Sequence, residues 1–187
     1  YILKGEKMDP YHMEYKVERF PEKVLVYIEV EKNTRVKYEY CEELKALLLD
    51  RILHSAVFYP HNYGFIPRTL CGDGDPLDIL VMTTEPLKPG TFCIARPICH
   101  LIMEDEKGMD EKVLAVCDND AHFCNIQSVD DLNNHVIDEL TAFFETYKKL
   151  EKKKWVKIKD WSSRDETYEL ILNTQRKYIE SKVHEIV

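Results

Sequence analysis

Three aspartates stand within six residues in the stretch 73–78, DGDPLD, and apolar runs flank it on both sides. Gly74 and Pro76 exclude a helix there and predict an extended, turning backbone. Several carboxylate oxygens then converge on a small volume, and a bound cation relieves their mutual repulsion. Oxygen-only ligands favour a hard ion such as Mg2+, Mn2+ or Ca2+ over zinc. Taken alone, the cluster is better interpreted as a solvated turn.

Other charged side chains interrupt apolar segments elsewhere in the chain. Glu29 lies within an apolar segment, and Arg51 interrupts a run of leucines. An arginine in such a run is costly to bury unless it meets an anion. Lys37 and Glu39 share one face of an alternating segment, where a solvated charge pair is the alternative interpretation. The acidic stretch 104–111 is typical of a hairpin tip, and taken alone it is interpreted as solvated.

Composition bounds the protein class. A chain of 187 residues is most simply one domain, and its net charge of −8 argues against a nucleic-acid partner. No apolar run is long enough to span a membrane. Six cysteines without a C-x-x-C pair indicate reduced thiols of an intracellular, cytoplasmic protein. The chain begins at Tyr1 rather than Met, so organellar targeting by an upstream segment is left open.

Hydrophobic periodicity predicts short strands first and helices last. The expected strands cover 23–30, 36–40, 46–53, 79–83, 91–103, 112–117 and 152–159. Helix start signals at 128–131 and 163–166 precede two segments of helical spacing, the second reaching about residue 184. The aromatic stretch 58–67 is expected to be a loop. This order favours an α+β fold, a small closed β-barrel with packed helices.

Many carboxylates together with a few Lys and Arg suit a polyanionic substrate that binds as a multi-metal complex. Acids hold the metals, the metals and cationic side chains bind phosphate oxygens, and a metal-activated water attacks. Phosphoryl transfer depends on positioning and charge neutralisation, so it requires no Ser or Cys nucleophile. The sequence has no glycine-rich phosphate loop, which argues against a P-loop nucleoside triphosphatase.

The sequence resembles the soluble family I inorganic pyrophosphatases. Their Asp-x-Asp-Pro-x-Asp signature matches residues 73–78, and the resemblance extends over roughly 24–178. The segment YPHNYGFIPRTLC at 59–71 is most similar to plant and protist members. The family implies a five-stranded OB-like β-barrel with additional strands and two packed helices in the C-terminal third. Residues 1–22 would form an N-terminal arm and 23–187 a single pyrophosphatase domain.

The resemblance implies hydrolysis of pyrophosphate to two orthophosphates with several Mg2+ ions, for which Mn2+ is a possible substitute. Asp73, Asp78 and Asp110 match the principal metal ligands, and Asp105 matches a ligand of a further metal. Asp75 matches the residue that orients and deprotonates the attacking water.

The remaining matched positions surround the substrate. Tyr59 matches a tyrosine at the edge of the site, regarded as a proton donor. The positions that match phosphate-binding groups are Lys37, Arg51, Tyr63, Lys112, Tyr147 and Lys148. The positions that match supporting carboxylates are Glu29, Glu39 and Glu106.

Two other function classes remain as alternatives. One is an OB-type nucleic-acid or interaction module without catalysis, which the barrel and surface aromatics would suit but the acidic balance opposes. The other is a metal-dependent hydrolase of nucleotides or polyphosphate. The expected partner is pyrophosphate, with neither nucleic acid nor membrane, and a homo-oligomer is possible because oligomeric state varies within the family.

Overall fold

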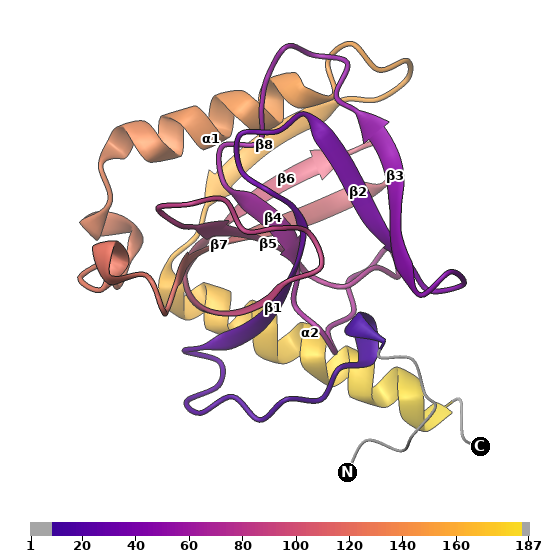
Figure 1. The fold of residues 1–187 in the computed structure, drawn as a ribbon, viewed down its shortest axis with the longest axis vertical. Coiled ribbons are helices and arrows are strands. Elements are labelled where there is room, and N and C mark those ends of the chain that lie inside the picture. The colour runs from indigo at the N-terminus through magenta and orange to yellow at the C-terminus, as the bar shows by residue number, and fades with distance from the viewer. Residues whose placement is uncertain (1–8, 185–187) are drawn as a thin grey trace.

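The computed structural model describes residues 9–184, and a ring of five strands forms its centre (Figure 1). In spatial order the strands are β1 (Val24–Val30), β4 (Asn62–Phe65), β5 (Asp78–Met82), β7 (Gly108–Cys117) and β6 (Phe92–Asp105). Pairing of β1 with β6 closes the ring. The β5–β7 pair is parallel and the other pairs are antiparallel. The predicted five-stranded OB-like barrel is therefore present.

Three further strands and two helices complete the fold. β8 (Val156–Trp161) pairs with β6 and extends the barrel sheet. β2 (Val36–Cys41) and β3 (Ala46–Ile52) form a separate two-stranded hairpin beside the barrel (Figure 1). Helices α1 (Asn134–Tyr147) and α2 (Arg164–His184) lie in the C-terminal third, as predicted. No helix within residues 9–184 is both long and apolar enough to cross a membrane.

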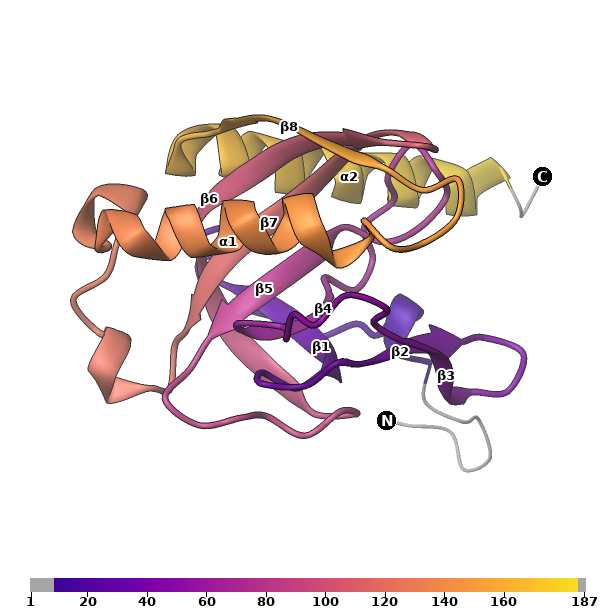
Figure 2. The same cartoon turned by 90° about the horizontal axis from the view of Figure 1, so that it is seen from above.

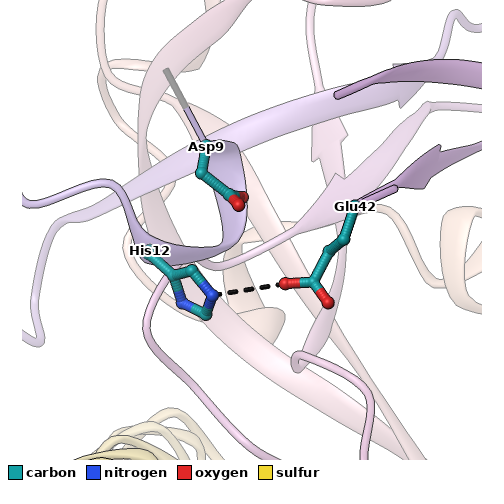
Figure 3. Close-up of side chains that lie close together, drawn as sticks. All are labelled: Asp9, His12 and Glu42. Carbon is teal, nitrogen blue, oxygen red and sulfur yellow. Dashed lines mark ion pairs between the residues drawn. The ribbon is translucent and has the colours of Figure 1, made fainter. Parts of the chain in front are cut away.

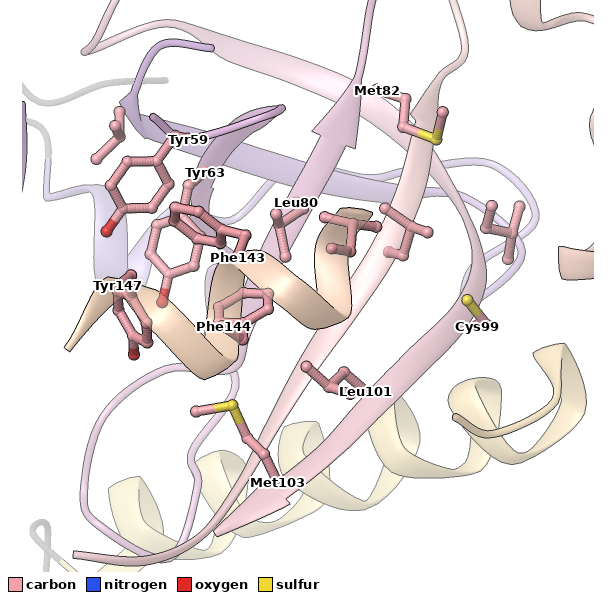
Figure 4. Close-up of a cluster of buried hydrophobic side chains, with 14 of the residues drawn as sticks. Tyr59, Tyr63, Leu80, Met82, Cys99, Leu101, Met103, Phe143, Phe144 and Tyr147 are labelled. Atoms are coloured by element: carbon pink, nitrogen blue, oxygen red, sulfur yellow. The ribbon is translucent and has the colours of Figure 1, made fainter. Parts of the chain in front are cut away.

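The central strands bury both of their faces because side chains alternate along a strand. In β5, Leu80 and Met82 join the apolar cluster that contains the buried face of α1 (Figure 4). Ile79 and Val81 join a second cluster, to which α2 contributes Ile171. The two helices therefore cover opposite sides of the strands, which Figure 2 shows from above. This double burial explains why these strands are continuous apolar runs in the sequence.

Gly64 permits β1 and β4 to approach closely. A Cβ atom at this position would lie 1.8 Å from the backbone oxygen of Tyr27, so no other residue fits without movement of a strand. The stretch 58–67 was expected to be a loop, and this prediction was wrong for residues 62–65. Gly and Pro residues in the stretch suggested a turn, whereas Gly64 serves strand pairing.

Three further boundaries differ from the prediction. The strand expected at 152–159 is β8, which begins only at Val156 and extends to Trp161. The helix signal at 128–131 forms a capping box around a short 3-10 helix, and α1 begins only at Asn134. The acidic stretch 104–111 is mostly strand, because β6 extends to Asp105 and β7 begins at Gly108. The second capping box is confirmed: the Ser163 backbone N–H donates to Glu166 at 2.8 Å, where α2 begins.

Candidate active site

A cavity of about 430 Å3 opens between the β2–β3 hairpin and one end of the barrel. Fourteen of the fifteen site residues predicted from the sequence line it, and only Tyr59 does not. The predicted residues that line this cavity are Glu29, Lys37, Glu39, Arg51, Tyr63, Asp73, Asp75, Asp78, Asp105, Glu106, Asp110, Lys112, Tyr147 and Lys148. The fold therefore brings charged side chains from segments far apart in the chain together around this cavity.

The aspartate stretch has the turning backbone that the sequence predicts. Gly74 adopts a φ of +92°, which residues with a side chain rarely adopt. The Asp73 carboxylate accepts a hydrogen bond from the backbone N–H of Asp75 at 3.2 Å. Leu77 is fully buried and anchors the end of the turn, while Asp73 and Asp75 are exposed to the cavity. The turn thus presents its carboxylates toward solvent and ligand.

Lys112 lies at the centre of the acidic wall. Parallel pairing of β5 with β7 places it beside Asp78, with which it forms an ion pair. Its ammonium nitrogen also lies 2.7 Å from a carboxylate oxygen of Asp110. Burial by itself lowers the pKa of Lys112, but these two carboxylates outweigh it and hold the pKa well above its ordinary value. Lys112 therefore stays charged.

Asp110 has the opposite electrostatic balance. Burial is the largest cause that raises its pKa, and the neighbouring carboxylates of Asp78 and Asp105 raise it further, although Lys112 counteracts them. Carboxylates that lie close together in a buried position repel each other, and a bound cation or a proton relieves that repulsion. The carboxylate is therefore suited to a divalent ion.

Asp105 and Lys148 form a second buried pair on the same wall. The Lys148 ammonium lies 2.6 Å from the Asp105 carboxylate and 3.8 Å from that of Glu106. The backbone N–H of Lys107 also donates to Asp105, at 2.8 Å. Burial opposes ionisation of Asp105, yet these two donors lower its pKa overall. Asp105 is therefore held as a carboxylate.

The β2–β3 hairpin supplies the cations of the opposite wall. Lys37 pairs with Arg51 across the hairpin, and the register shifts there so that Asp50 is the extra residue. Asp50 contacts both cations, Arg51 directly and Lys37 at 3.6 Å. The Arg51 Nε donates to the buried carboxylate of Glu151 at 2.8 Å. These contacts hold Lys37 and Arg51 at the cavity.

Glu29 reaches the cavity from β1 through a break in strand pairing. The β1–β4 register shifts between Ile28 and Val30, which displaces Glu29 from the regular alternation. The side chain is 5% exposed and accepts a hydrogen bond from the Tyr40 backbone N–H at 2.7 Å. Burial raises the pKa of Glu29 to about 8, so a nearby cation would favour its charged form.

Two tyrosines line the floor of the cavity, and a third lies behind them. Tyr63 and Tyr147 line it, whereas Tyr59 is fully buried with its ring centroid 5.5 Å from that of Tyr63. Figure 4 shows the hydroxyl oxygens of all three at the same end of the cluster. The sequence placed Tyr59 at the edge of the site, but the structure places it in the layer behind Tyr63. Its role as a proton donor stays a prediction.

The donor set of the cavity suits hard cations. Nine acidic and six basic side chains line it, which leaves an excess of three negative charges. The acidic ligands offer only oxygen atoms, which Mg2+ and Ca2+ prefer. In this structure three of the four predicted metal ligands, Asp78, Asp105 and Asp110, pair with Lys112 or Lys148, so the lysines neutralise part of the acidic charge.

The comparisons with known proteins agree with this arrangement. A family model described as inorganic pyrophosphatase matches residues 26–179. This chain belongs to the inorganic pyrophosphatase family. It is 47% identical over 164 residues to an inorganic pyrophosphatase of Saccharolobus solfataricus, covering 87% of this chain and 93% of the relative. Soluble inorganic pyrophosphatase 3 of Arabidopsis thaliana is 42% identical over 176 residues, with 92% and 81% covered.

A crystal structure of the inorganic pyrophosphatase from Thermus thermophilus has a TM-score of 0.89 and 43% identity. The alignment covers 91% of this chain and 99% of the other. Archaeal, bacterial and plant relatives match this pyrophosphatase at similar identities, so a special closeness to plant and protist members stays a prediction.

Sequence reasoning missed seven residues that line the cavity of this pyrophosphatase: Tyr11, Tyr40, Asp50, Phe65, Pro76, Lys107 and Lys154. The sequence did signal Asp50, which interrupts the leucine run beside Arg51. Lys154 also lines the cavity, and its ammonium lies 3.0 Å from Glu151. Tyr11 had no local signal, because it reaches the cavity only through tertiary packing.

The segment that carries Tyr11 is fastened to the hairpin. The rings of Tyr11 and Tyr40 have centroids 5.1 Å apart. Asp9, His12 and Glu42 place their ligand atoms within 4.8 Å of one another, and His12 lies 3.2 Å from Glu42 (Figure 3). Asp9 also forms an ion pair with Lys45, so the Lys45 ammonium already neutralises one acid of this trio. These contacts attach the described part of the N-terminal arm to the β2–β3 hairpin.

Proposed function

We propose that this chain hydrolyses inorganic pyrophosphate to two orthophosphates with bound Mg2+, in the cavity beneath the β2–β3 hairpin. The observation that carries the proposal is the convergence of fourteen predicted residues on one cavity of about 430 Å3. Acids from the barrel form one wall, and Lys37 and Arg51 from the hairpin face them. An acidic wall that faces a basic wall suits a polyanion that binds together with metal ions.

The barrel acids would hold the metal ions. We assign Asp73, Asp78 and Asp110 as principal ligands and Asp105 as the ligand of a further ion. Glu29, Glu39 and Glu106 support them as additional carboxylates. Bound Mg2+ neutralises phosphoryl charge and lowers the pKa of the attacking water. Mn2+ is the proposed substitute, because it also takes oxygen ligands.

The remaining side chains act on the substrate and on the water. Lys37, Arg51, Lys112 and Lys148 bind phosphate oxygens, and the hydroxyl groups of Tyr63 and Tyr147 donate to the same oxygens. Asp75 orients the attacking water and removes its proton. Its carboxylate is 65% exposed, and the cation nearest to it is Lys107 at 3.8 Å. An acid without a close cationic partner is free to accept a proton.

A phosphate-release assay tests the reaction and its substrate together. Pyrophosphate, ATP and tripolyphosphate are each supplied with Mg2+, with Mn2+ and with a chelator. We expect rapid release from pyrophosphate with Mg2+, slower release with Mn2+ and none with the chelator. Preferential cleavage of ATP or tripolyphosphate would favour a nucleotide or polyphosphate hydrolase. No cleavage of any substrate would favour a binding module.

Assembly and compartment are further proposals. The hairpin exposes Leu48, Leu49 and Ile52, each more than half accessible, and an assembly of identical chains would cover such residues. Light scattering of the purified chain measures the mass of that assembly. The six cysteines are all free thiols, which supports the cytoplasm, and imaging of the tagged full-length protein tests that location.

A further inference from the structure

A second cavity, of about 480 Å3, lies at the other end of strand β6 from the candidate active site. Arg96 lines it near the start of β6, whereas Asp105 ends the same strand. The two residues are nine positions apart, which corresponds to at most about 30 Å at about 3.3 Å per residue. A ligand here would therefore not touch the substrate of the candidate active site.

The charge of this second cavity is the reverse of that of the first. Four cationic side chains line it, Arg19, Lys23, Arg96 and Arg164, against two acids, Glu22 and Asp118. Arg19 and Glu22 pair with each other at the exposed rim. The inner part therefore has three cations and one carboxylate, in a chain whose net charge is −8.

The inner cations are held in place. Asp118 lies 2.7 Å from the Lys23 ammonium and 3.2 Å from the Arg96 Nε, so a single carboxylate serves two cations. Arg96 is 15% exposed and also donates to the backbone oxygen of Phe123 at 2.8 Å. Arg164, the first residue of α2, donates to the backbone oxygen of Gln127 at 3.2 Å. Three separate segments thus fix the geometry.

Two donors of these arginines lack an acceptor. Within residues 9–184, the Nε atoms of Arg96 and Arg164 are buried and form no hydrogen bond. The nearest carboxylates form ion pairs with them instead, Asp118 at 3.2 Å from the Arg96 Nε and Asp165 at 3.8 Å from the Arg164 Nε. A buried donor without an acceptor costs free energy. A tetrahedral oxyanion in the cavity would neutralise the excess charge, and guanidinium N–H groups match its oxygen spacing.

We propose that this second cavity binds a phosphate-type oxyanion through Lys23, Arg96 and Arg164. The oxyanion is either free orthophosphate or the phosphoryl group of a larger metabolite, for which the cavity volume leaves room. The inference stands apart from pyrophosphate hydrolysis, because none of these three side chains lines the candidate active site.

Equilibrium dialysis with radiolabelled orthophosphate tests the site in the full chain with Mg2+. Arg164→Gln removes a cation of the second cavity, and Arg176→Gln is the matched control, an exposed arginine of the same helix that does not line it. We expect Arg164→Gln to bind one orthophosphate fewer per chain, or to bind it about tenfold more weakly. Arg176→Gln should bind as the wild type does. Lys23→Gln should reproduce the loss, and all three variants should still hydrolyse pyrophosphate.

A parallel arm with radiolabelled AMP distinguishes the two sources of the phosphoryl group. One outcome is that the wild type binds AMP, Arg164→Gln does not, and all proteins bind orthophosphate equally. That outcome would assign the site to a larger phosphorylated metabolite. Loss of orthophosphate binding alone would assign it to free phosphate. Equal binding of both probes by the wild type, Arg164→Gln, Lys23→Gln and Arg176→Gln would overturn the proposal.

Discussion

The two hairpins that meet at the active-site cavity are supported very differently. β6 and β7 belong to the closed ring, where they also pair with β1, β5 and β8, and their central residues are fully buried. β2 and β3 pair only with each other among residues 9–184. A two-stranded hairpin is marginally stable by itself, so its position depends on what it contacts outside its own strands.

The contacts of the β2–β3 hairpin are few and identifiable. Tyr40 packs in a small aromatic cluster with Tyr27 and Phe65, and the Arg51–Glu151 pair connects the hairpin to the segment after α1. The proposed metal ligands therefore lie mainly on or beside the rigid ring, whereas Lys37 and Arg51 lie on the less supported element. This division predicts that barrel substitutions change the chemical step and the Mg2+ dependence, while hairpin substitutions change substrate binding.

The largest effect is expected for Asp75→Asn, on the turn that leads into the ring. If Asp75 is the base, the turnover number should fall by about 10²–10⁴-fold, because amide nitrogen and oxygen cannot accept the proton. The Mg2+ concentration for half-maximal activity should stay near that of the wild type. Steady-state kinetics across a Mg2+ titration measures both quantities. Turnover within a factor of two of the wild type would remove Asp75 from this role.

A smaller but more selective effect is expected at the β6–β7 hairpin. Asp110→Asn should keep on the order of 1% of wild-type activity at millimolar Mg2+, since a carboxylate proposed to bind the metal directly loses its charge. Asp105→Asn should be impaired and recover in part as Mg2+ is raised. Activity measured against Mg2+ concentration distinguishes the two.

Glu104→Gln and Glu111→Gln are matched controls on the same strands. Glu104 is partly exposed and lies 2.6 Å from Lys159 of β8, outside the active-site cavity. Neither Glu104 nor Glu111 lines the cavity, so both controls should retain full activity. An equal, modest loss in all four variants would show a diffuse negative field and would disprove the individual assignments to metal.

Hairpin variants that keep their charge should change substrate binding by a smaller factor. Arg51→Lys cannot bind Glu151 and a phosphate with one planar group, and Lys37→Arg replaces a compact ammonium. We expect KM for pyrophosphate to rise about tenfold in each, with thermal stability and the Mg2+ midpoint little changed. Arg176→Lys on the surface of α2 is the control. Full activity with unchanged KM would make Arg51 or Lys37 structural.

Local signals in the sequence predicted four of the five ring strands and both helices. Apolar, β-branched segments marked most of these strands, and the capping box at 163–166 marked the start of α2. The Asp-x-Asp-Pro-x-Asp motif indicated the family, and the resemblance to that family supplied most of the cavity residues. The sequence could not place residues whose position depends on distant partners. Tyr11 contacts Tyr40 across 29 residues of chain, and Glu151 contacts Arg51 across 100. Likewise, β4 was missed because Gly64 resembles a turn signal until the close approach of β1 is known.

The smallest predicted effect concerns His61, in the connection between the hairpin and β4. Both of its ring nitrogens are buried and have no hydrogen-bond partner within residues 9–184. Burial, reinforced by the charge of Lys32, lowers the pKa of His61 to about 4. An unfolded histidine takes up its proton near pH 6.5. Between about pH 6.5 and 4 the unfolded chain therefore binds the proton more strongly, and the free energy of unfolding falls as the pH falls.

His61→Gln removes this contribution because glutamine does not titrate. Urea unfolding at pH 7.5 and pH 5 should show that the wild type loses about 1–3 kcal/mol more than the variant over this interval. His54→Gln is the control: His54 is exposed on the same connection, so that variant should lose as much as the wild type. An identical loss in His61→Gln and the wild type would mean that His61 is already accessible to protons in the folded state. The connection would then be looser than its burial indicates, and the hairpin would have less support than the aromatic cluster and the Arg51–Glu151 pair suggest.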